Sequence, residues 1–553
     1  MRSFLITAGS QLLLAAWGLS ESLPDLPIVD LGYALHKASS FNSTGNYFTF
    51  SNIRYAAPPI GELRFAAPIP PENNRSAGVQ DGSYGPMCPQ SALPVWEQVS
   101  RAFITSLSKG NTNFTPPAVN FTVPTPDPRE SEDCLFLDVL VSKDILKKAG
   151  NGTGGAPALV WIHGGAYVVG EKNLYGNPAG LLRQSGPDSI SGSSPEVIYI
   201  ALNYRLGAFG WLAGPTLQSN GSANVGLLDQ RLALEWVQKY IHLFGGDPKR
   251  VTVFGESAGG GSIMHQITAY GGIQGDGVVP FQQAIMQSPG FLPLPSLFQQ
   301  EESFNGFLKF LGVNTIEEAR KLPTKDLALA SSLMVINATY GTYTWGPVVD
   351  GTFVPALPGK LLLQGAFDHS VRVMGLFFTD PSITNDAKFT TYFQVHFPSA
   401  RPEVLQFIQT TLYPPIFDGS FGYTNPTERL LVAIAEFAFT CNTNFFDRAL
   451  DNKTFAYMFS VPPALHGQDV PYTFYNGDGK PTDSVVNATV AFALQKYITD
   501  FAKTGNPDGP GLPHFPLYGD KSTVVSLNAT TISETRDPVS NLRCEWWQKA
   551  LYF

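Results

Sequence analysis

Residues 245–262 read GGDPKRVTVFGESAGGGS, and this stretch decides the fold. Its β-branched run VTVF predicts a short strand, which leads through a G-x-S-x-G pattern centred on Ser257 into a Gly-rich helix start. A strand, a sharp turn and a helix in this order are the context of a nucleophile elbow. Gly255 and Gly259 flank Ser257 because strand and helix can pass closely there only without Cβ atoms. The pattern alone also arises by chance in a chain with 53 glycines, so a surface turn is the alternative.

A second motif upstream strengthens the first. Residues 158–162 read ALVWI, an uninterrupted apolar run of the kind that suits a parallel strand buried on both faces. The run ends in His163, which is expected to shape the following turn, and then in small residues. Such a turn lets backbone N–H groups point toward a developing oxyanion, and we expect Gly165, Ala166 and Ala258 to be the donors. Both motifs together predict a serine esterase.

Five further stretches carry a family resemblance. They read NIRYAAPPIGELRFAAPIPP at 52–71, EDCLFLDV at 132–139, LNYRLGAFGW at 202–211, NVGLLDQRLALEWV at 224–237 and WGPVVDGTFVP at 345–355. With the two motifs above, the chain resembles the type B carboxylesterase/lipase family, which includes fungal lipases, carboxylesterases and cholinesterases. The resemblance implies an α/β-hydrolase fold, with a large, mostly parallel central sheet flanked by helices and with long loop and helix insertions.

The general base is expected to be a histidine, because its pKa lies near neutrality and its ring can take the serine proton and pass it to the leaving alcohol. His466 opens the segment HGQDVPYTF after a strand-like apolar run at 455–459, and this segment resembles the family's catalytic-histidine motif. Glu256 and Asp229 lie within family motifs, and we expect them to support the site rather than to carry protons.

The acid of the triad is where the chain departs from the family. After the strand-like VRVMG at 371–375, the family carries Gly-x-Asn-x-x-Glu-Gly, and the part with the Glu is missing here. Codons lost at a splice junction, a substitute carboxylate, or a protein that is not a competent enzyme would each explain the gap. Asp380 is the substitute we name, since it has the family acid's five-residue offset from Gly375. Asp368 and Asp386 are weaker candidates. The last explanation keeps open a catalytically impaired or non-enzymatic binding or adhesion protein of the same fold.

Composition indicates one large secreted domain. The 553 residues are 43% hydrophobic and 15% charged, and no linker-like segment divides them, so 21–553 is expected to form a single domain. Residues 1–20 have the layout of a secretory signal peptide, with Arg2 before an apolar core that is too short to cross a bilayer. No transmembrane segment is expected, and the predicted location is extracellular or in the cell wall.

The cysteines and the glycosylation sequons agree with export of the protein from the cell. An even count of four cysteines suits an oxidising compartment and allows three pairings, of which the resemblance implies Cys88–Cys134 and Cys441–Cys544. Ten N-x-S/T sequons predict glycosylation at Asn42, Asn74, Asn113, Asn120, Asn151, Asn220, Asn337, Asn452, Asn487 and Asn528. No C-x-x-C or close histidine cluster occurs, so neither a metal nor another cofactor is expected.

The net charge of the protein indicates which classes of partner it can bind. The net charge of −9 and the pI of about 5.4 provide no electropositive field for nucleic acid. Low charge and 12% aromatic content fit a cleft for small uncharged esters. A scavenged lipid and a tailored secreted metabolite are both compatible with the sequence, as is any oligomeric state.

A possible lid lies between Cys88 and Cys134. Trp96, Val99, Phe103 and Leu107 recur at helical spacing and predict an amphipathic helix. The same region is the flap in lipases of the family, but periodicity alone favours an ordinary surface helix packed on the core.

Overall fold

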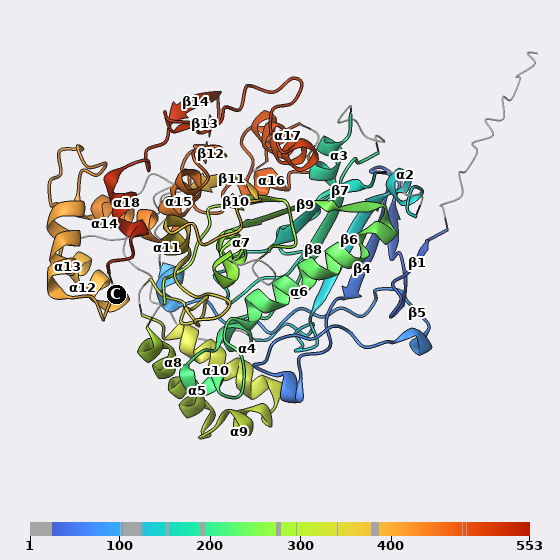
Figure 1. Cartoon of the computed structure of the whole chain (residues 1–553), viewed down its shortest axis with the longest axis horizontal. Coiled ribbons are helices and arrows are strands. Elements are labelled where there is room, and N and C mark those ends of the chain that lie inside the picture. The colour runs from blue at the N-terminus through green and yellow to red at the C-terminus, as the bar shows by residue number, and fades with distance from the viewer. Residues whose placement is uncertain are drawn as a thin grey trace, which may run out of the picture.

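A mixed sheet of eleven strands organises the described part of the chain in the computed structural model of the protein (Figure 1). In chain order the strands are β3 (Ser40–Asn42), β4 (Tyr47–Arg54), β6 (Phe136–Ser142), β7 (Ala156–Ile162), β8 (Ile198–Leu202), β9 (Gly246–Glu256), β10 (Gln283–Gln287), β11 (Arg372–Phe377), β12 (Phe455–Phe459), β13 (Thr523–Leu527) and β14 (Ile532–Arg536). The structure describes residues 25–99, 102, 123, 125–150, 154–187, 194–272, 278–294, 296–339, 341–377, 386–477, 479–482 and 484–552.

The spatial order of the strands is β14-β13-β12-β11-β10-β9-β7-β8-β6-β4-β3. Every neighbouring pair from β8 to β13 is parallel, whereas the pairs toward both edges are antiparallel. This confirms the large, mostly parallel sheet and the α/β-hydrolase fold predicted from the sequence. A separate small sheet contains β1 (Ile28–Asp30), β2 (Leu35–Lys37) and β5 (Val79–Gln80).

The central strands β7 and β8 are apolar throughout because their side chains alternate between two hydrophobic cores. In β7, Ala158, Val160 and Ile162 belong to one core, and Leu159 and Trp161 belong to the other. Helices α6 (Val225–Tyr240) and α7 (Ala258–Ile267) contribute to the first core and lie in front of the sheet in Figure 1, whereas α3 (Ala179–Ser185) and α17 (Ala488–Thr504) contribute to the second.

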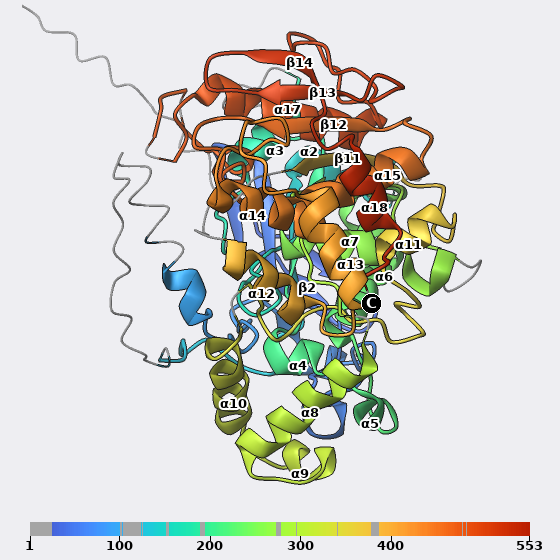
Figure 2. The ribbon, with the colours of Figure 1, turned by 90° about the vertical axis from the view of Figure 1, so that its left-hand side faces the viewer.

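Inserted helices surround this framework, as predicted. The remaining α-helices are α2 (Lys143–Leu146), α4 (Gly207–Trp211), α5 (Pro215–Gln218), α8 (Leu297–Leu311), α9 (Ile316–Arg320), α10 (Thr324–Ile336), α11 (Pro358–Leu363), α12 (Asp386–His396), α13 (Pro402–Phe407), α14 (Pro426–Ala435), α15 (Cys441–Ala449), α16 (Val470–Thr473) and α18 (Leu542–Gln548). Figure 2 shows α8, α9 and α10 extending to one side of the sheet, and α12, α13 and α14 grouped near α18.

Both disulfide pairings implied by the resemblance are confirmed. Cys88 bonds to Cys134, and Cys441 at the start of α15 bonds to Cys544 in α18, so all four cysteines are used. The second bridge joins residues 103 positions apart and ties the inserted helices to the C-terminal helix. In the chain-entropy model this bridge stabilises the fold more than Cys88–Cys134 does, because it closes a longer loop; a loop of about 100 residues contributes on the order of 4–5 kcal/mol.

The turn between β9 and α7 depends on two glycines. A Cβ atom on Gly255 would lie 2.6 Å from the carbonyl oxygen of Ile162, and one on Gly259 would lie 2.0 Å from the same oxygen. That oxygen ends β7, so the helix after β9 crosses directly over the neighbouring strand. The expectation that these two positions must lack a Cβ atom is confirmed.

Gly259→Ala is therefore expected to be strongly destabilising. Ile162 is the last residue of the buried strand β7 and its backbone oxygen cannot withdraw from the new methyl group, so the free energy of unfolding should fall by about 1–3 kcal/mol or more. Denaturant unfolding measures the effect. Gly154→Ala is the matched control, because nothing lies within 4 Å of the Cβ atom it would add. Equal unfolding midpoints for the two variants would contradict the packing argument.

Candidate active site

Ser257 occupies a strained turn at the carboxyl end of β9. Its φ of 57° and ψ of −121° are rare for a residue with a side chain. The turn is held by the chain after β10: the Ser257 N–H donates to the Gln287 carbonyl, and the Gly290 N–H donates to the Ser257 carbonyl, each at 2.9 Å. Because α7 starts at the next residue, the serine side chain is presented at the edge of the sheet rather than within a strand.

His466 meets this serine from a distant part of the chain. Its Nε2 lies 2.8 Å from Ser257 Oγ, although 209 residues separate the two. His466 follows β12, and β12 runs parallel to β9 with β10 and β11 between them, so both residues emerge at the same edge of the sheet. The imidazole side chain is 30% exposed, so it can exchange a proton with a bound molecule. The structure thus brings together the predicted nucleophile and base.

Glu256 also contacts the imidazole, but on the serine side. Its Oε1 lies 3.3 Å from His466 Nε2, the nitrogen that faces Ser257 Oγ. A triad acid acts at the other ring nitrogen, so this geometry does not make Glu256 a triad acid. Burial, followed by the negative charge of Asp469, raises the pKa of the Glu256 carboxyl well above its usual range.

Asp469 forms the centre of a buried polar group beneath the histidine loop. Its Oδ2 accepts hydrogen bonds from Gln287 Nε2 at 2.7 Å and from the Tyr457 hydroxyl at 3.3 Å. Gln287 Nε2 also donates to Thr473 Oγ1 at 3.1 Å. These bonds join the end of β10, β12 and α16. Asp469 lies within the segment HGQDVPYTF, but the sequence does not predict this network.

The expected oxyanion donors lie on the two turns that flank Ser257. A Cβ atom on Gly164 would lie 3.1 Å from the Ser257 Cβ, so the turn after β7 packs against the serine. Gly165 and Ala166 have φ values of 110° and 54°, which curl this turn. Ala258 is the first residue of α7, and a helix provides no internal partner for its first N–H groups. Both turns therefore offer backbone amides beside the serine hydroxyl.

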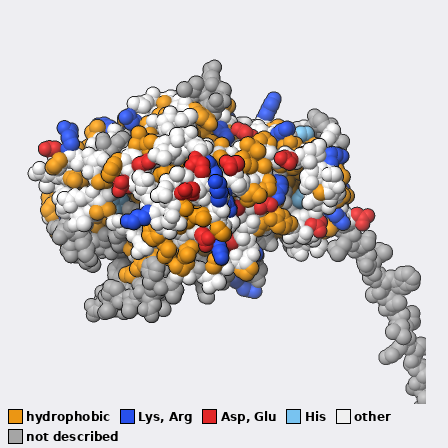
Figure 3. All heavy atoms as spheres, turned by 90° about the horizontal axis from the view of Figure 1, so that it is seen from below, with side chains coloured by type: hydrophobic (Ala, Val, Ile, Leu, Met, Phe, Trp, Pro, Cys, Tyr) orange, Lys and Arg blue, Asp and Glu red, His pale blue; other side chains and the backbone are white. Residues whose placement is uncertain are grey.

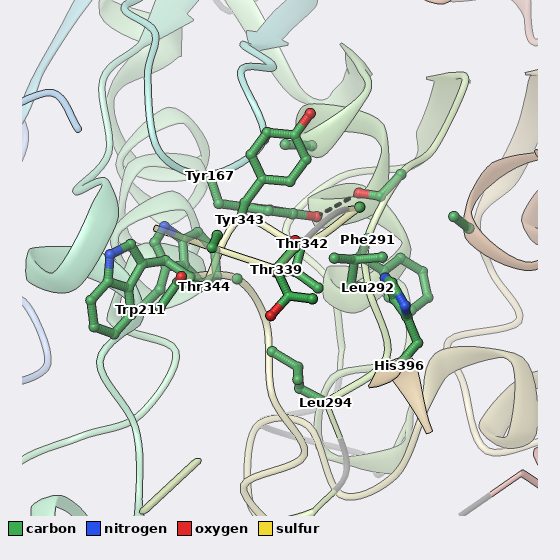
Figure 4. A pocket seen from close by; sticks show the side chains of 18 of the residues that line it. Tyr167, Trp211, Phe291, Leu292, Leu294, Thr339, Thr342, Tyr343, Thr344 and His396 are labelled. Carbon is green, nitrogen blue, oxygen red and sulfur yellow. Dashed lines mark hydrogen bonds between the residues drawn. The ribbon is translucent and has the colours of Figure 1, made fainter. Parts of the chain in front are cut away.

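One cavity of about 1070 Å³ joins these groups. Ser257, His466, Gly165, Ala166 and Ala258 all contribute to its wall. Figure 4 shows part of the remaining wall, where aromatic and aliphatic side chains from separate segments surround the space: Tyr167, Trp211, Phe291, Leu292, Leu294 and Tyr343. The Tyr167 hydroxyl donates to the Gly290 carbonyl at 2.9 Å and so fixes the wall next to the serine turn.

The lid hypothesis is only partly within the described residues. Trp96 lies in a helical turn at the cavity wall, where its Nε1 donates to the Thr342 carbonyl at 3.0 Å. Val99 belongs to the same turn. Phe103 and Leu107 lie outside the described residues, so the predicted amphipathic helix stays a prediction.

The structure describes some of the carboxylates that are candidates for the triad acid and not others. Asp380 lies outside the described residues. Asp368 accepts hydrogen bonds from the Ser370 and Val279 amides at 2.9 and 3.0 Å, which gives it a local role in a loop. Asp386 begins α12. Asp229 forms a buried ion pair with Arg205 at 2.7 Å, as expected for a supporting residue.

The described residues contain neither a metal-binding cluster nor a membrane-spanning helix. No three His, Cys, Asp or Glu side chains of the described residues are grouped so that they could hold a metal ion. Within those same ranges, no helix has both the length and the apolar composition that crossing a bilayer requires.

Asp469 predicts a pH-dependent stability. Burial raises the pKa of this carboxyl from 3.8 to about 6. Between these values the folded protein binds a proton that the unfolded chain has released, so stability falls as the pH rises through about 6. The shift corresponds to about 3 kcal/mol. Asp469→Asn should therefore unfold with a weaker dependence on pH between about 4 and 7 than the wild type, measured by denaturant titration.

The wild type is the proper reference for this measurement, because burial also raises the pKa of Asp537 to about 6 and this background persists in the variant. Parallel curves for wild type and variant would show that Asp469 does not titrate in this range.

Comparison with known proteins places the fold and the site in a family. A model described as the carboxylesterase family matches residues 36–412. Carboxylesterase patB of Aspergillus clavatus is 44% identical over 99% of this chain and 100% of its own, and a secreted lipase of Arthroderma benhamiae is 29% identical over 85% and 89%. The crystal structure of Aspergillus niger EstA has the same fold, with a TM-score of 0.74 at 24% identity and coverage of 95% and 98%. The chain belongs to the carboxylesterase family and is a serine carboxylic ester hydrolase.

Proposed function

We propose that the protein is a secreted enzyme that cleaves uncharged carboxylic esters through an acyl-enzyme on Ser257. The observation that carries the proposal is the 2.8 Å contact between Ser257 Oγ and His466 Nε2 on the wall of the cavity. A hydroxyl and an imidazole at this distance are a nucleophile and its base. The bond between Ser257 and the acyl group can form without a triad carboxylate, but such an acid speeds the reaction because it orients the imidazole ring.

The proposed reaction has two stages. His466 Nε2 takes the proton of Ser257 as Oγ attacks the ester carbonyl, and the amides of Gly165, Ala166 and Ala258 stabilise the tetrahedral oxyanion. The imidazolium then protonates the leaving alcohol, which leaves an acyl group on Ser257. Water, deprotonated by the same histidine, attacks this acyl group and releases the acid.

The apolar cavity supports uncharged substrates. Its aromatic and aliphatic wall can desolvate an acyl chain or a neutral alcohol, and no Lys or Arg stands among the described residues that line it, so an anionic group finds no counter-charge there. Figure 3 shows acidic and basic side chains interspersed over the face seen from below, without a field of one sign that would attract a charged polymer. We therefore propose a small-molecule ester as the partner and no nucleic acid.

Secretion is supported by the two disulfides and by the similarity to a secreted lipase. Of the sequon asparagines, Asn74, Asn220 and Asn337 are exposed, and Asn42, Asn452, Asn487 and Asn528 are partly exposed. Glycans can therefore be carried at these positions. Asn113, Asn120 and Asn151 lie outside the described residues. The proposal retains a signal peptide at 1–20 and a single domain at 21–553.

Asp380 remains the proposed third member of the triad. β11 ends at Phe377 and runs parallel to both β10 and β12, so the chain leaves it at the edge of the sheet that carries Ser257 and His466. An acid shortly after this point is close in sequence to the place where the triad needs it. Its carboxylate would orient the imidazole and stabilise the imidazolium.

Ser257→Ala is expected to abolish turnover of a short-chain p-nitrophenyl ester. Loss of the nucleophile costs on the order of 10⁶ in kcat in a comparable triad. Stoichiometric labelling by an organophosphate should disappear in the same variant. Ser219→Ala, at an exposed serine in the turn after α5, is the matched control and should keep both properties. Full esterase activity in the Ser257 variant would refute the proposed mechanism.

Asp380→Asn tests the acid separately. If Asp380 orients His466, kcat should fall by about four orders of magnitude while organophosphate still labels the protein slowly. Asp418→Asn, at an exposed loop aspartate, serves as the control. Unchanged turnover in the Asp380 variant would remove this residue from the triad without affecting the roles of Ser257 and His466.

A further inference from the structure

We propose that Phe439 is a positioning residue that holds the His466 imidazole in its catalytic orientation, an inference that rests on the proposed function. The two ring centroids lie 4.7 Å apart with an angle of 55° between the planes. Phe439 is only half-buried and contributes to the cavity wall together with His466. No motif in the sequence points to this residue, since one Phe among 39 carries no pattern.

A break in helical register puts Phe439 there. The segment Glu436–Thr440 is a π-helical turn between α14 and α15. A π-turn contains one residue more than an α-helical turn, so the side chains that follow are rotated by about 100° relative to an unbroken α-helix. Phe437 is buried and does not line the cavity, whereas Ala438 and Phe439 both contribute to the cavity wall. Single π-turns within α-helices are frequent at functional sites because they redirect side chains in this way.

Polar contacts tie this π-turn to the serine turn. The Asn442 side-chain amide donates to the Pro289 carbonyl at 2.9 Å and to the Ala438 carbonyl at 3.1 Å. Gly290, next to Pro289, donates its N–H to the Ser257 carbonyl at 2.9 Å. Phe439 and Ser257 are therefore both fixed to the short segment after β10, and the Cys441–Cys544 bridge anchors the π-turn from the other side.

Gly290 leaves room for the Phe439 ring because it has no side chain. A Cβ atom on Gly290 would lie 2.3 Å from Phe439 Cε1 and 2.8 Å from its Cδ1. The edge of the ring thus rests on the backbone of Gly290, while the ring also contacts the imidazole. With backbone on one side and His466 on the other, the aromatic ring restricts rotation of the imidazole toward the cavity.

The contact suits the chemistry of the base. When His466 takes the Ser257 proton it becomes an imidazolium, and a cation within about 6 Å of an aromatic centroid is attracted by the ring. The same packing keeps water from one side of the imidazole. This chain lacks the family's usual acid-bearing segment after Gly375. The orientation of the His466 imidazole therefore depends more strongly on its contact with Phe439.

The test compares Phe439→Ala, Phe439→Leu and Phe439→Tyr with wild type by steady-state kinetics on a short-chain p-nitrophenyl ester. A misplacement of about 1 Å costs about 100-fold, so kcat should fall by about 100-fold in the Ala variant, with KM changed less than about threefold. The Leu variant fills the volume without an aromatic face and should lose about tenfold, whereas Tyr keeps the ring and should retain most of kcat. Phe407→Ala, which removes a ring stacked on Trp546 outside the cavity wall, is the control.

The rate of organophosphate labelling of Ser257 gives a second readout, because it needs the same base but none of the ester-binding contacts. It should fall in parallel with kcat. A variant with wild-type kcat, or one in which only KM rises, would show that Phe439 merely lines the cavity and would overturn the proposal. Inactivity of Ser257→Ala together with fully active Phe439→Ala would refute this inference and leave the proposed function intact.

Gly290→Ala keeps the proposal falsifiable if the Phe439→Ala variant does not fold. The added methyl group should displace the ring and lower kcat, with KM again little changed. In a double-mutant cycle the Gly290 effect should shrink when Leu replaces Phe439, because the ring that it displaces is gone. Strictly additive effects would contradict the assignment.

Discussion

The close approach of β7 to the turn between β9 and α7 is the constraint on which the site depends. The carbonyl oxygen of Ile162 faces the Cα atoms of Gly255 and Gly259, and neither position has room for a side chain. This contact forces Ser257 into its rare backbone conformation and also brings the turn after β7 against the serine. The proposed nucleophile and oxyanion donors are thus placed by one backbone contact at the end of β7, not by two independent loops.

The parallel arrangement of the strands also positions His466, the proposed base. β9, β10, β11 and β12 are neighbours and all run in one direction, so the loops that follow them meet at one edge. Ser257 follows β9, the Gln287–Gly290 segment begins at the last residue of β10, and His466 follows β12. The segment after β10 is the bridge, because its backbone binds Ser257 and its Gln287 side chain binds Asp469 beneath the histidine loop. Distance along the chain is irrelevant to this assembly.

The sequence indicates some of these features and not others for identifiable reasons. The strand before His163 is a continuous apolar run and the strand before Ser257 contains the β-branched run VTVF. Each is followed by small residues, and that local pattern predicts both the buried sheet and the turns at its edge. The pairing of cysteines and the place of His466 came from resemblance, since four cysteines alone allow three pairings. The structure contains both bridges, and it puts His466 beside Ser257.

Phe439 and the Asp469 network could not be predicted because they depend on relations that no local pattern records. Phe439 reaches His466 only through a π-turn that changes the register of an otherwise apolar helix, and periodicity within that segment does not mark the change. Asp469 is recognisable as an acid near a histidine, but its partners Gln287 and Tyr457 lie on β10 and β12, two strands that only the order of the sheet brings close, with β11 between them. Motifs identify the reacting groups, whereas the contacts that orient them belong to the assembled sheet.

The site also concentrates unfavourable terms that the rest of the fold must offset. Ser257 is strained, and the burial that raises the pKa values of Glu256 and Asp469 disfavours their charged forms. The strain at Ser257 alone costs on the order of 1–3 kcal/mol, which is a large fraction of the net stability of an ordinary domain. Two continuous hydrophobic cores on the faces of one large sheet supply the compensation. Because those cores border β9 on both sides, the elbow cannot relax without disturbing them, and rigidity at the serine follows from burial of the strand beneath it.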